Sequence, residues 1–338
     1  MRALVADPAA PAKLRLDEVP EPDHGQVLLD VHHISLNHGE IAFAGRLAPG
    51  TVHGYDAAGV VVRAAEGSPP VGARVIAFGA GAWAERMAVN ADAVAEVPAA
   101  VDLADAAALP MAGLTALRTL RTAPILGKRV LITGASGGVG RFAVQLAAIG
   151  GAHVIAQANR QDGLAELGAH EVVADLAGVR PVDLVLDNVG GRLLVDAWKL
   201  LKPGGSVQNI GWTSGEPAVF EPYSIFSIGP SKSLNTFGDV TAPAADLSTL
   251  AELLAAGRIS PEVGWRGLVG TPRRGRRSAA AAAGHGQGRA GREGLTCGSG
   301  FASMSGSSRT ATCWKRFATP RPTASGASGW GSTPRGTC

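Results

Sequence analysis

Val130-Leu-Ile-Thr133-Gly-Ala-Ser-Gly-Gly-Val-Gly140 is the stretch that decides the fold of this chain. Residues 130–133 are a short apolar run, typical of a strand buried on both faces of a parallel sheet. The glycines that follow permit a tight turn and let a phosphate approach the backbone closely. Apolar residues then repeat at helical spacing, and residues 153–158 supply a second strand. The stretch therefore predicts a βαβ unit whose helix begins where the pyrophosphate of a dinucleotide binds.

The residues of this turn and of the following strand end are the predicted cofactor contacts. NAD sites usually place Asp or Glu at the strand end to bind the ribose 2′-hydroxyl, but this chain has no carboxylate there before Asp162. An arginine at this place complements a 2′-phosphate by its charge and its forked donors, so the sequence favours NADPH. The alternative is that Arg160 is a solvated surface charge. The predicted contacts here are Gly134, Ala135, Ser136, Gly137, Gly138, Val139, Gly140, Asn159 and Arg160.

The length of 338 residues suits two domains, and the formal net charge of +3 is unevenly distributed. From Gly267 onward, ten Arg and one Lys stand against a single acid, Glu293, so residues 1–266 are acidic. An acidic body gives no indication of nucleic-acid binding. No stretch reaches the apolar length that spans a bilayer, and the N-terminus has no secretory pattern. We therefore expect no nucleic-acid or membrane partner and a cytoplasmic location.

Residues 267–338 differ in kind from the rest of the chain. They contain 15 Gly but only one Val, no Ile and no Tyr. So little branched apolar content does not offset the entropy of ordering, and we predict disorder. All three cysteines, Cys297, Cys313 and Cys338, lie here without metal-type spacing, and we expect them not to touch the enzyme body. Our hypothesis is that the change near Gly267 marks a shifted reading frame, which the coding DNA would test.

The remaining elements predict an α/β fold. Residues 1 to about 105 read as short strands broken by turns and prolines, a compact β domain. Beyond residue 160, strand and helix patterns alternate, which predicts a doubly wound parallel sheet. The predicted domains are 1–110, to which the chain returns at about 240–266, and 111–239 for the dinucleotide. We expect strands at 171–175, 182–189, 206–211 and 233–238, and helices at 163–167, 193–201 and 247–256.

A series of motifs in fixed order runs through residues 1–266. The chain resembles the zinc-independent branch of the medium-chain dehydrogenase/reductase superfamily, the quinone oxidoreductase and enoyl reductase group. A short-chain dehydrogenase would instead need Tyr-x-x-x-Lys after the turn, but Ser227 stands where Tyr223 would require the lysine. The motifs are Ile34-Ser-Leu-Asn37, Gly54-Tyr-Asp-Ala-Ala-Gly-Val-Val, Gly72-Ala-Arg-Val, Ala108-Leu-Pro-Met-Ala-Gly-Leu-Thr115, the turn at 134–140, Asp183-Leu-Val-Leu-Asp-Asn-Val-Gly-Gly191 and Leu201-Lys-Pro-Gly-Gly.

The resemblance implies a GroES-like N-terminal domain, a Rossmann domain and hydride transfer from NADPH to a small-molecule quinone or α,β-unsaturated carbonyl. It also implies a homodimer formed through the edge strand near residues 233–238. By family position, Asn37 and Thr115 lie at the nicotinamide end. Asn188, Val189, Gly211 and Trp212 follow strand ends and line the cofactor cleft. Two alternatives stay open: Asn188 caps the next helix, and the Thr115 hydroxyl bonds to its own helix backbone.

The predicted catalytic residues are Asn37, for orientation, and His38, whose imidazole suits general acid work. Many relatives carry Tyr where this chain has Ala42. Solvent, Tyr55 or Tyr223 are therefore the other proton sources, and the alternative for His38 is a structural hydrogen-bond partner.

We expect no metal, because residues 1–266 lack cysteine. The alternative is a metal held by His38, His53, Glu40 and Asp56. The competing function is a catalytically silent NADPH-binding protein, either a redox sensor or a damaged enzyme. The missing Tyr and the unusual C-terminal residues favour it. The sequence does not identify the substrate; it predicts a partly apolar pocket between the domains.

Overall fold

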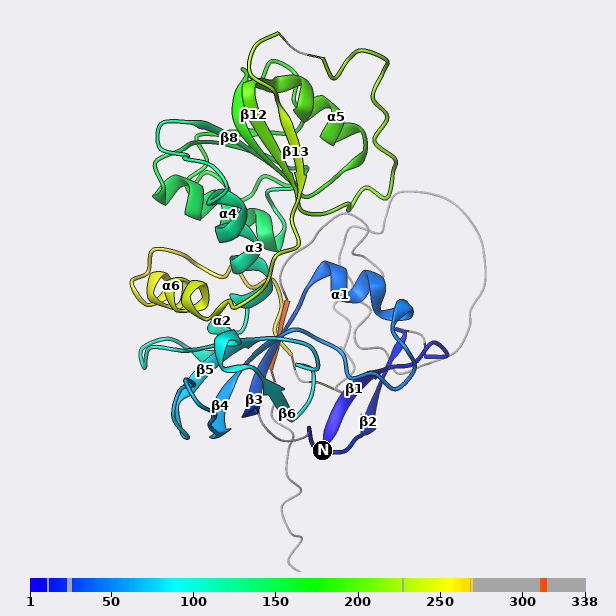
Figure 1. The fold of residues 1–338 in the computed structure, drawn as a ribbon, viewed down its shortest axis with the longest axis vertical. Helices are drawn as coiled ribbons and strands as arrows, with labels where there is room; N and C mark the ends of the chain where they lie inside the picture. The colour runs from blue at the N-terminus through cyan, green and yellow to red at the C-terminus, as the bar shows by residue number, and fades with distance from the viewer. Residues whose placement is uncertain (11, 23–25, 227, 268, 270–310, 315–338) are drawn as a thin grey trace, which may run out of the picture.

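The computed structural model describes residues 1–10, 12–22, 26–226, 228–267, 269 and 311–314, the last four by their backbone alone. Two lobes stand one above the other in Figure 1. The upper lobe holds a parallel sheet and the lower lobe an antiparallel one. Helices α2 (Leu103–Ala106), α3 (Pro110–Leu120) and α6 (Ala244–Ala255) lie where the lobes meet.

The upper sheet is a doubly wound Rossmann sheet with the strand order β10-β9-β8-β11-β12-β13. Every pairing in it is parallel. The order reverses between β8 and β11, and open α/β sheets bind ligands at such a switch point. The strands are β8 (Arg129–Thr133), β9 (His153–Gln157), β10 (Glu171–Val173), β11 (Val182–Asp187), β12 (Leu201–Asn209) and β13 (Ser233–Thr236).

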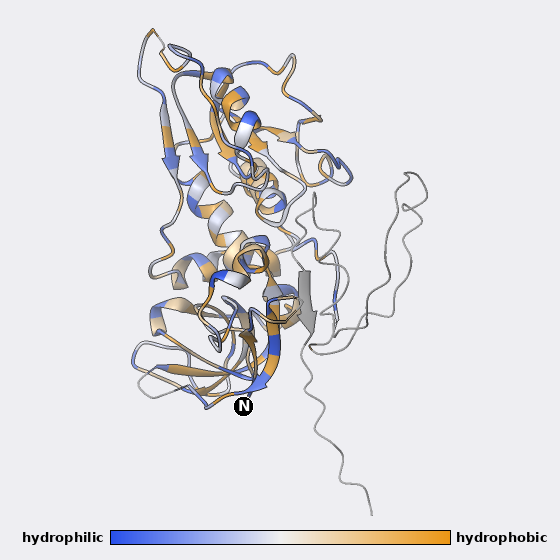
Figure 2. Cartoon of the chain, turned by 90° about the vertical axis from the view of Figure 1, so that its right-hand side faces the viewer, coloured by the Kyte–Doolittle hydropathy of each residue, from blue (hydrophilic) through white to orange (hydrophobic). Residues whose placement is uncertain are grey.

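Alternate residues of these strands face two separate cores. Val130 and Ile132 pack toward α3, α4 (Gly138–Ile149) and α6, whereas Leu131 packs toward α5 (Gly191–Leu200). Both faces are covered, which is why the strands read as continuous apolar runs rather than alternating ones. Apolar residues run through the strands in Figure 2.

The lower lobe is the GroES-like β domain that the sequence predicts. Its sheet has the order β14-β3-β4-β5-β7, and β6 also pairs with β3. A separate antiparallel pair, β1 and β2, lies beside it. The elements are β1 (Arg2–Ala6), β2 (Leu14–Glu18), β3 (Val27–Leu36), α1 (His38–Phe43), η1 (Ala44–Arg46), β4 (Asp56–Arg63), β5 (Arg74–Phe78), β6 (Arg86–Val89), η2 (Ala91–Ala93), β7 (Val94–Glu96) and β14 (Ala311–Trp314).

Two expectations for secondary structure are wrong. Residues 163–167 form turns instead of a helix, since Gly163 (φ +73°) and Gly168 (φ +107°) adopt left-handed backbone at both ends of a very short segment. In the C-terminal segment, Ala311–Trp314 form β14, which pairs antiparallel with β3 and places Cys313 opposite Ile34. One cysteine therefore does reach the enzyme body. The rest of that predicted tail, apart from residues 267 and 269, lies outside the described residues.

Candidate functional site

The glycine turn connects β8 to α4 and is held from both sides. Ala135 N–H donates to the Gln157 carbonyl (2.9 Å), and Gly134 N–H donates to the Gln157 side chain (3.2 Å), which ties the turn to the end of β9. Gly134 has φ +60°. A Cβ on Gly140 would lie 2.6 Å from both the Ala135 Cα and the Gly134 carbonyl oxygen, so only glycine allows α4 to pack this closely on the turn.

The first turn of α4 fits an anionic cofactor. Its N-cap, Gly137, provides no capping side chain, and the first turn contains no acidic residue. The amides of the first helical residues therefore lack side-chain partners, and the helix dipole favours a negative group there. This is the arrangement that holds a dinucleotide pyrophosphate.

A buried hydrogen-bond network joins the carboxyl ends of β8, β11 and β12. The Thr133 hydroxyl donates to the Asp187 carboxylate (2.6 Å), which also accepts from Gly190 N–H (3.0 Å) and from the Asn209 amide (2.8 Å). Asn188 donates its side-chain amide to the Thr133 carbonyl (2.9 Å). Asn188 thus links two strand ends, and the N-cap of α5 is Gly190, so the capping alternative is wrong.

A cavity of about 490 Å³, here called the main cavity, opens between the glycine turn and α1. It lies at the carboxyl ends of the parallel strands, where α/β sheets bind ligands. The predicted residues Asn37, His38, Thr115, Gly134, Gly137, Gly138, Val139, Gly140, Asn188, Gly211 and Trp212 line it. Further lining comes from Leu36, Gly39, Glu40, Phe43, Leu47, His53, Tyr55, Met111, Ile210, Thr213, Phe237, Gly238 and Val240.

Five predicted cofactor residues lie outside that lining: Ala135, Ser136, Asn159, Arg160 and Val189. Ala135 is fully buried beneath the turn. Asn159 and Arg160 are exposed on the loop after β9, at the carboxyl edge of the parallel sheet. The main cavity therefore brings together the nicotinamide-end candidates, while the adenosine-end candidates sit on the neighbouring open surface.

Asn37, which lines the main cavity, holds two buried carboxyl groups, those of Glu40 and Asp56. Its amide nitrogen donates to Asp56 (2.7 Å) and to Glu40 (3.1 Å), and its backbone N–H also donates to Glu40 (2.7 Å). Tyr55 N–H binds Glu40 (2.8 Å), and Met111 N–H binds Asp56 (2.9 Å). Both amide hydrogens of Asn37 are thus engaged within the protein, so it orients the carboxyl pair.

Burial shifts the ionisation of this pair strongly. Burial, followed by repulsion from Asp56, raises the pKa of Glu40 to about 8, and burial raises the pKa of Asp56 to about 7. The backbone and Asn37 hydrogen bonds oppose these shifts without cancelling them. Near neutral pH the pair therefore retains at least one proton.

The two histidines of this region, His53 and His38, differ in burial and in hydrogen bonding. His53 is buried; its Nε2 lies 2.8 Å from the Glu40 carbonyl, and its Nδ1 accepts from Gly54 N–H (2.7 Å). Burial lowers the pKa of His53, so the neutral imidazole with its proton on Nε2 fits both bonds. His38, by contrast, is exposed and lines the main cavity. Of these two, His38 is the one placed to meet a substrate.

The structure also places Thr115 and the two tyrosines that were alternative proton sources. The Thr115 hydroxyl donates to the Met111 carbonyl (2.7 Å), which is the helix-backbone alternative stated above. Tyr223 is 81% exposed and is not among the main-cavity residues, so it is not placed to donate a proton there. Tyr55 does line the cavity and stacks against Phe78.

Sequence reasoning missed the buried roles of Glu40, Asp56, Thr133, Asp187 and Arg141. The sequence suggests Glu40 and Asp56 only as metal ligands.

Among the described residues, no group of three or more His, Cys, Asp or Glu side chains is arranged to hold a metal ion. Nor is any described helix long and apolar enough to cross a membrane.

Two family models match the chain on either side of the lobe junction. The model for the alcohol dehydrogenase GroES-like domain matches residues 23–99, and that for zinc-binding dehydrogenase matches residues 138–256. The quinone oxidoreductase of Rattus norvegicus is 31% identical over 241 residues, covering 62% of this chain and 73% of that protein. This chain belongs to the medium-chain dehydrogenase/reductase superfamily.

Structural neighbours agree with this membership of the quinone oxidoreductase-like part of the superfamily. A mycobacterial structure complexed with NADPH has a TM-score of 0.68 and 26% identity, covering 79% of this chain and 92% of that one. A highly reducing polyketide synthase of Cladosporium cladosporioides is 29% identical over 220 residues, 59% of this chain, but this stretch spans only 9% of that synthase. The rat relative is named a quinone oxidoreductase, and the mycobacterial neighbour carries bound NADPH.

Proposed function

We propose that this protein is an NADPH-dependent oxidoreductase that reduces a quinone or an α,β-unsaturated carbonyl without a metal. The observation that carries the proposal is the main cavity, whose one wall is the uncapped glycine turn and whose opposite wall is Asn37 and His38. The named activity of the rat relative and the NADPH bound to the mycobacterial neighbour support it.

The residues present fit the cofactor. The turn at 134–140 would hold the pyrophosphate, and Asn159 and Arg160 would face the adenosine ribose. When bound, NADPH supplies a hydride from its nicotinamide ring. Apolar side chains from Leu36, Phe43, Ile210 and Phe237 line the main cavity and exclude water around the acceptor.

The protein's own chemical task is to steady the oxygen of the reduced substrate and deliver a proton. His38 is the side chain we propose for that proton, because it is exposed to the main cavity, whereas His53 uses both ring nitrogens within the protein. The Asn37–Glu40–Asp56 cluster would keep the base of α1, and with it His38, in place.

The test is turnover of NADPH with a panel of quinones and enones, beside titration of NADPH and NADH into the wild type and Arg160→Ala. We expect NADPH oxidation, and a loss of about tenfold in NADPH affinity in Arg160→Ala because one charge-assisted contact is removed. NADH binding should change little. Equal affinity for both cofactors, together with an unaffected Arg160→Ala, would contradict the NADPH assignment.

Binding without turnover would instead select the competing function, a catalytically silent NADPH-binding protein. Two observations favour it: Ala42 stands where many relatives carry Tyr, and both amide hydrogens of Asn37 are engaged by carboxyl groups. The substrate panel separates the two functions directly.

We also propose that the protein forms a homodimer through β13. This strand ends the upper sheet, and all four of its residues are exposed. The preceding loop exposes large apolar side chains, including Phe226 (74%) and Ile228 (99%). An open strand edge beside an apolar patch is a surface that a second copy can cover.

Light scattering on the full chain is expected to give a dimer, and Ile228→Asp a monomer, because a charge would then be buried at the contact. Val71→Asp is the matched control, since Val71 is also exposed (63%) but lies in the lower lobe. A monomeric wild type would refute the proposal.

A further inference from the structure

Arg141 connects three separate segments of the chain from the first half of α4. Its side chain is only 9% exposed. Its Nε donates to the Ser136 carbonyl (3.3 Å), its Nη2 to the Asp162 carbonyl (2.8 Å) and its Nη1 to the Glu262 carboxylate (3.1 Å). One guanidinium therefore holds the glycine turn, the loop after β9 and the segment that follows α6.

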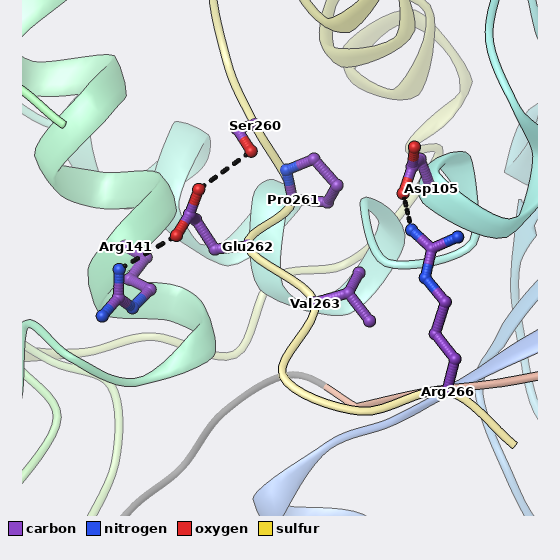
Figure 3. A pocket seen from close by; sticks show the side chains of 7 residues that line it. All are labelled: Asp105, Arg141, Ser260, Pro261, Glu262, Val263 and Arg266. Carbon is purple, nitrogen blue, oxygen red and sulfur yellow. Dashed lines mark hydrogen bonds and ion pairs between the residues drawn. The ribbon is translucent and has the colours of Figure 1, made fainter. Parts of the chain in front are cut away.

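The segment after α6 is a fixed support for this guanidinium. Gln145, one turn beyond Arg141, accepts from Ser260 N–H (2.6 Å) and donates to the Ser260 carbonyl (3.0 Å). The Ser260 hydroxyl donates to the second oxygen of Glu262 (3.0 Å), and Figure 3 shows Glu262 between Ser260 and Arg141, bonded to both. Glu262 adopts a left-handed backbone (φ 47°), which such surrounding contacts must maintain.

The far end of the same segment is anchored in the lower lobe. Arg266 forms an ion pair with Asp105 of α2, and Trp265 packs against the core of the antiparallel sheet. The segment therefore cannot swing away from α4 without breaking contacts at both ends. Contacts at both ends of this segment therefore fix the position of Glu262, and Glu262 in turn fixes the Arg141 guanidinium.

The loop after β9 is where this support matters. Asp162, whose carbonyl Arg141 binds, comes two residues after Arg160, and the buried Leu164 follows two residues later in the same loop. Arg141 itself lines a different cavity, of about 340 Å³, and is not among the main-cavity residues. Its guanidinium bonds to the Ser136 and Asp162 carbonyls and to the Glu262 carboxylate, so its influence on a bound nucleotide would pass through these segments.

We propose that Arg141 is a positioning residue that fixes the loop carrying Arg160 and thereby sets the preference for a 2′-phosphorylated dinucleotide. The inference rests on the proposed NADPH function. The planar fork of arginine donates in three directions at once, which the single ammonium of lysine does not reproduce. Because the 2′-phosphate is the group that this loop would meet, loss of Arg141 should affect NADPH more than NADH.

The experiment compares NADPH and NADH dissociation constants in the wild type, Arg141→Met and Arg141→Lys. We expect Arg141→Met to weaken NADPH by about tenfold and NADH by less than about threefold, since the loop loses a charge-assisted bond. Arg141→Lys should restore only part of the preference. The matched control is Arg118→Met: Arg118, on α3, likewise binds a carboxylate, that of Asp246, and backbone carbonyls, those of Asp239, Thr241 and Ala242. It should lower the melting temperature and leave the NADPH-to-NADH ratio unchanged.

The outcomes separate this inference from the proposed function. If the wild type binds neither dinucleotide, the proposed function fails. If the wild type prefers NADPH and Arg141→Met keeps the same ratio, the inference alone is overturned. Should Arg141→Met not fold, Glu262→Gln removes the supporting charge from outside the loop and should lower the ratio in the same direction; an unchanged ratio there also overturns the inference.

Discussion

Gly140→Ala is expected to lower NADPH affinity by about 30-fold or more. The added Cβ would lie 2.6 Å from the Gly134 oxygen and the Ala135 Cα, so the turn or α4 must move. Overpacking of this kind costs about 1–3 kcal/mol, and a shift of the turn or of α4 would also move the amides proposed to receive the pyrophosphate. Isothermal titration with NADPH and NADH measures the loss, which should be similar for both because both carry the same pyrophosphate.

Gly45→Ala is the matched control for this variant. Its Cβ would meet only the Lys13 side chain at 3.5 Å, an ordinary contact. We expect affinity within about twofold of the wild type for Gly45→Ala, since surface substitutions away from special features change stability little. If Gly140→Ala binds NADPH as tightly as Gly45→Ala, the turn is not the pyrophosphate site, and the proposed function loses its main support.

Stability is expected to fall as the pH rises from about 6 to 9. Glu40 and Asp56 have folded pKa values of about 8 and about 7, above the ordinary values of 4.5 and 3.8 that an unfolded chain would show. In this pH window the folded state therefore binds more protons than the unfolded state, and raising the pH favours unfolding. The loss is on the order of 3 kcal/mol, a fall in Tm of about 5–10 °C.

Melting curves from pH 5 to 9 measure this effect, with Glu40→Gln and Glu171→Gln for comparison. Glu40→Gln removes one buried titrating group and should flatten the alkaline decline. Hydrogen bonds from Arg129 and His153 lower the pKa of Glu171, so this residue titrates in the acid range and its replacement should leave the alkaline decline intact. A wild-type Tm that is constant or rises between pH 6 and 9 would show that the pair is ionised throughout.

The sequence predicts the upper sheet well because its central strands, β8 and β11, are buried on both faces. Residues 130–132 and 184–186 are continuous apolar runs, and their order with the glycine turn leaves few topologies. The helix expected at 163–167 fails because two left-handed glycines bound a segment too short to form one. β14 was not foreseeable, since its pairing with β3 joins residues about 280 positions apart in a stretch of low apolar content.

The residues of the candidate site likewise fall into those that the sequence locates and those that only the folded structure brings together. Local motifs locate the turn, Asn37, His38 and Asn188, because family spacing and strand ends place them. The buried pair of Glu40 and Asp56 is harder to foresee, because charged residues are normally exposed and only the folded chain brings Met111 N–H and Asn37 to their oxygens. Thr133 and Asp187, 54 residues apart, likewise meet only in the assembled sheet.

The strand ends behind the main cavity and the apolar side chains that line it differ in how well they tolerate substitution. Thr133, Asp187 and Asn188 are joined by hydrogen bonds at the strand ends. Replacing any one of them would leave a buried polar group without its hydrogen-bond partner. Phe43, Leu47 and Val240 line the main cavity with apolar side chains, and Phe43 is half exposed. Selection or engineering can therefore reshape the opening to admit new molecules while the apparatus behind it stays untouched. Related proteins with this fold can therefore change their substrate range while they keep the same strand-end network.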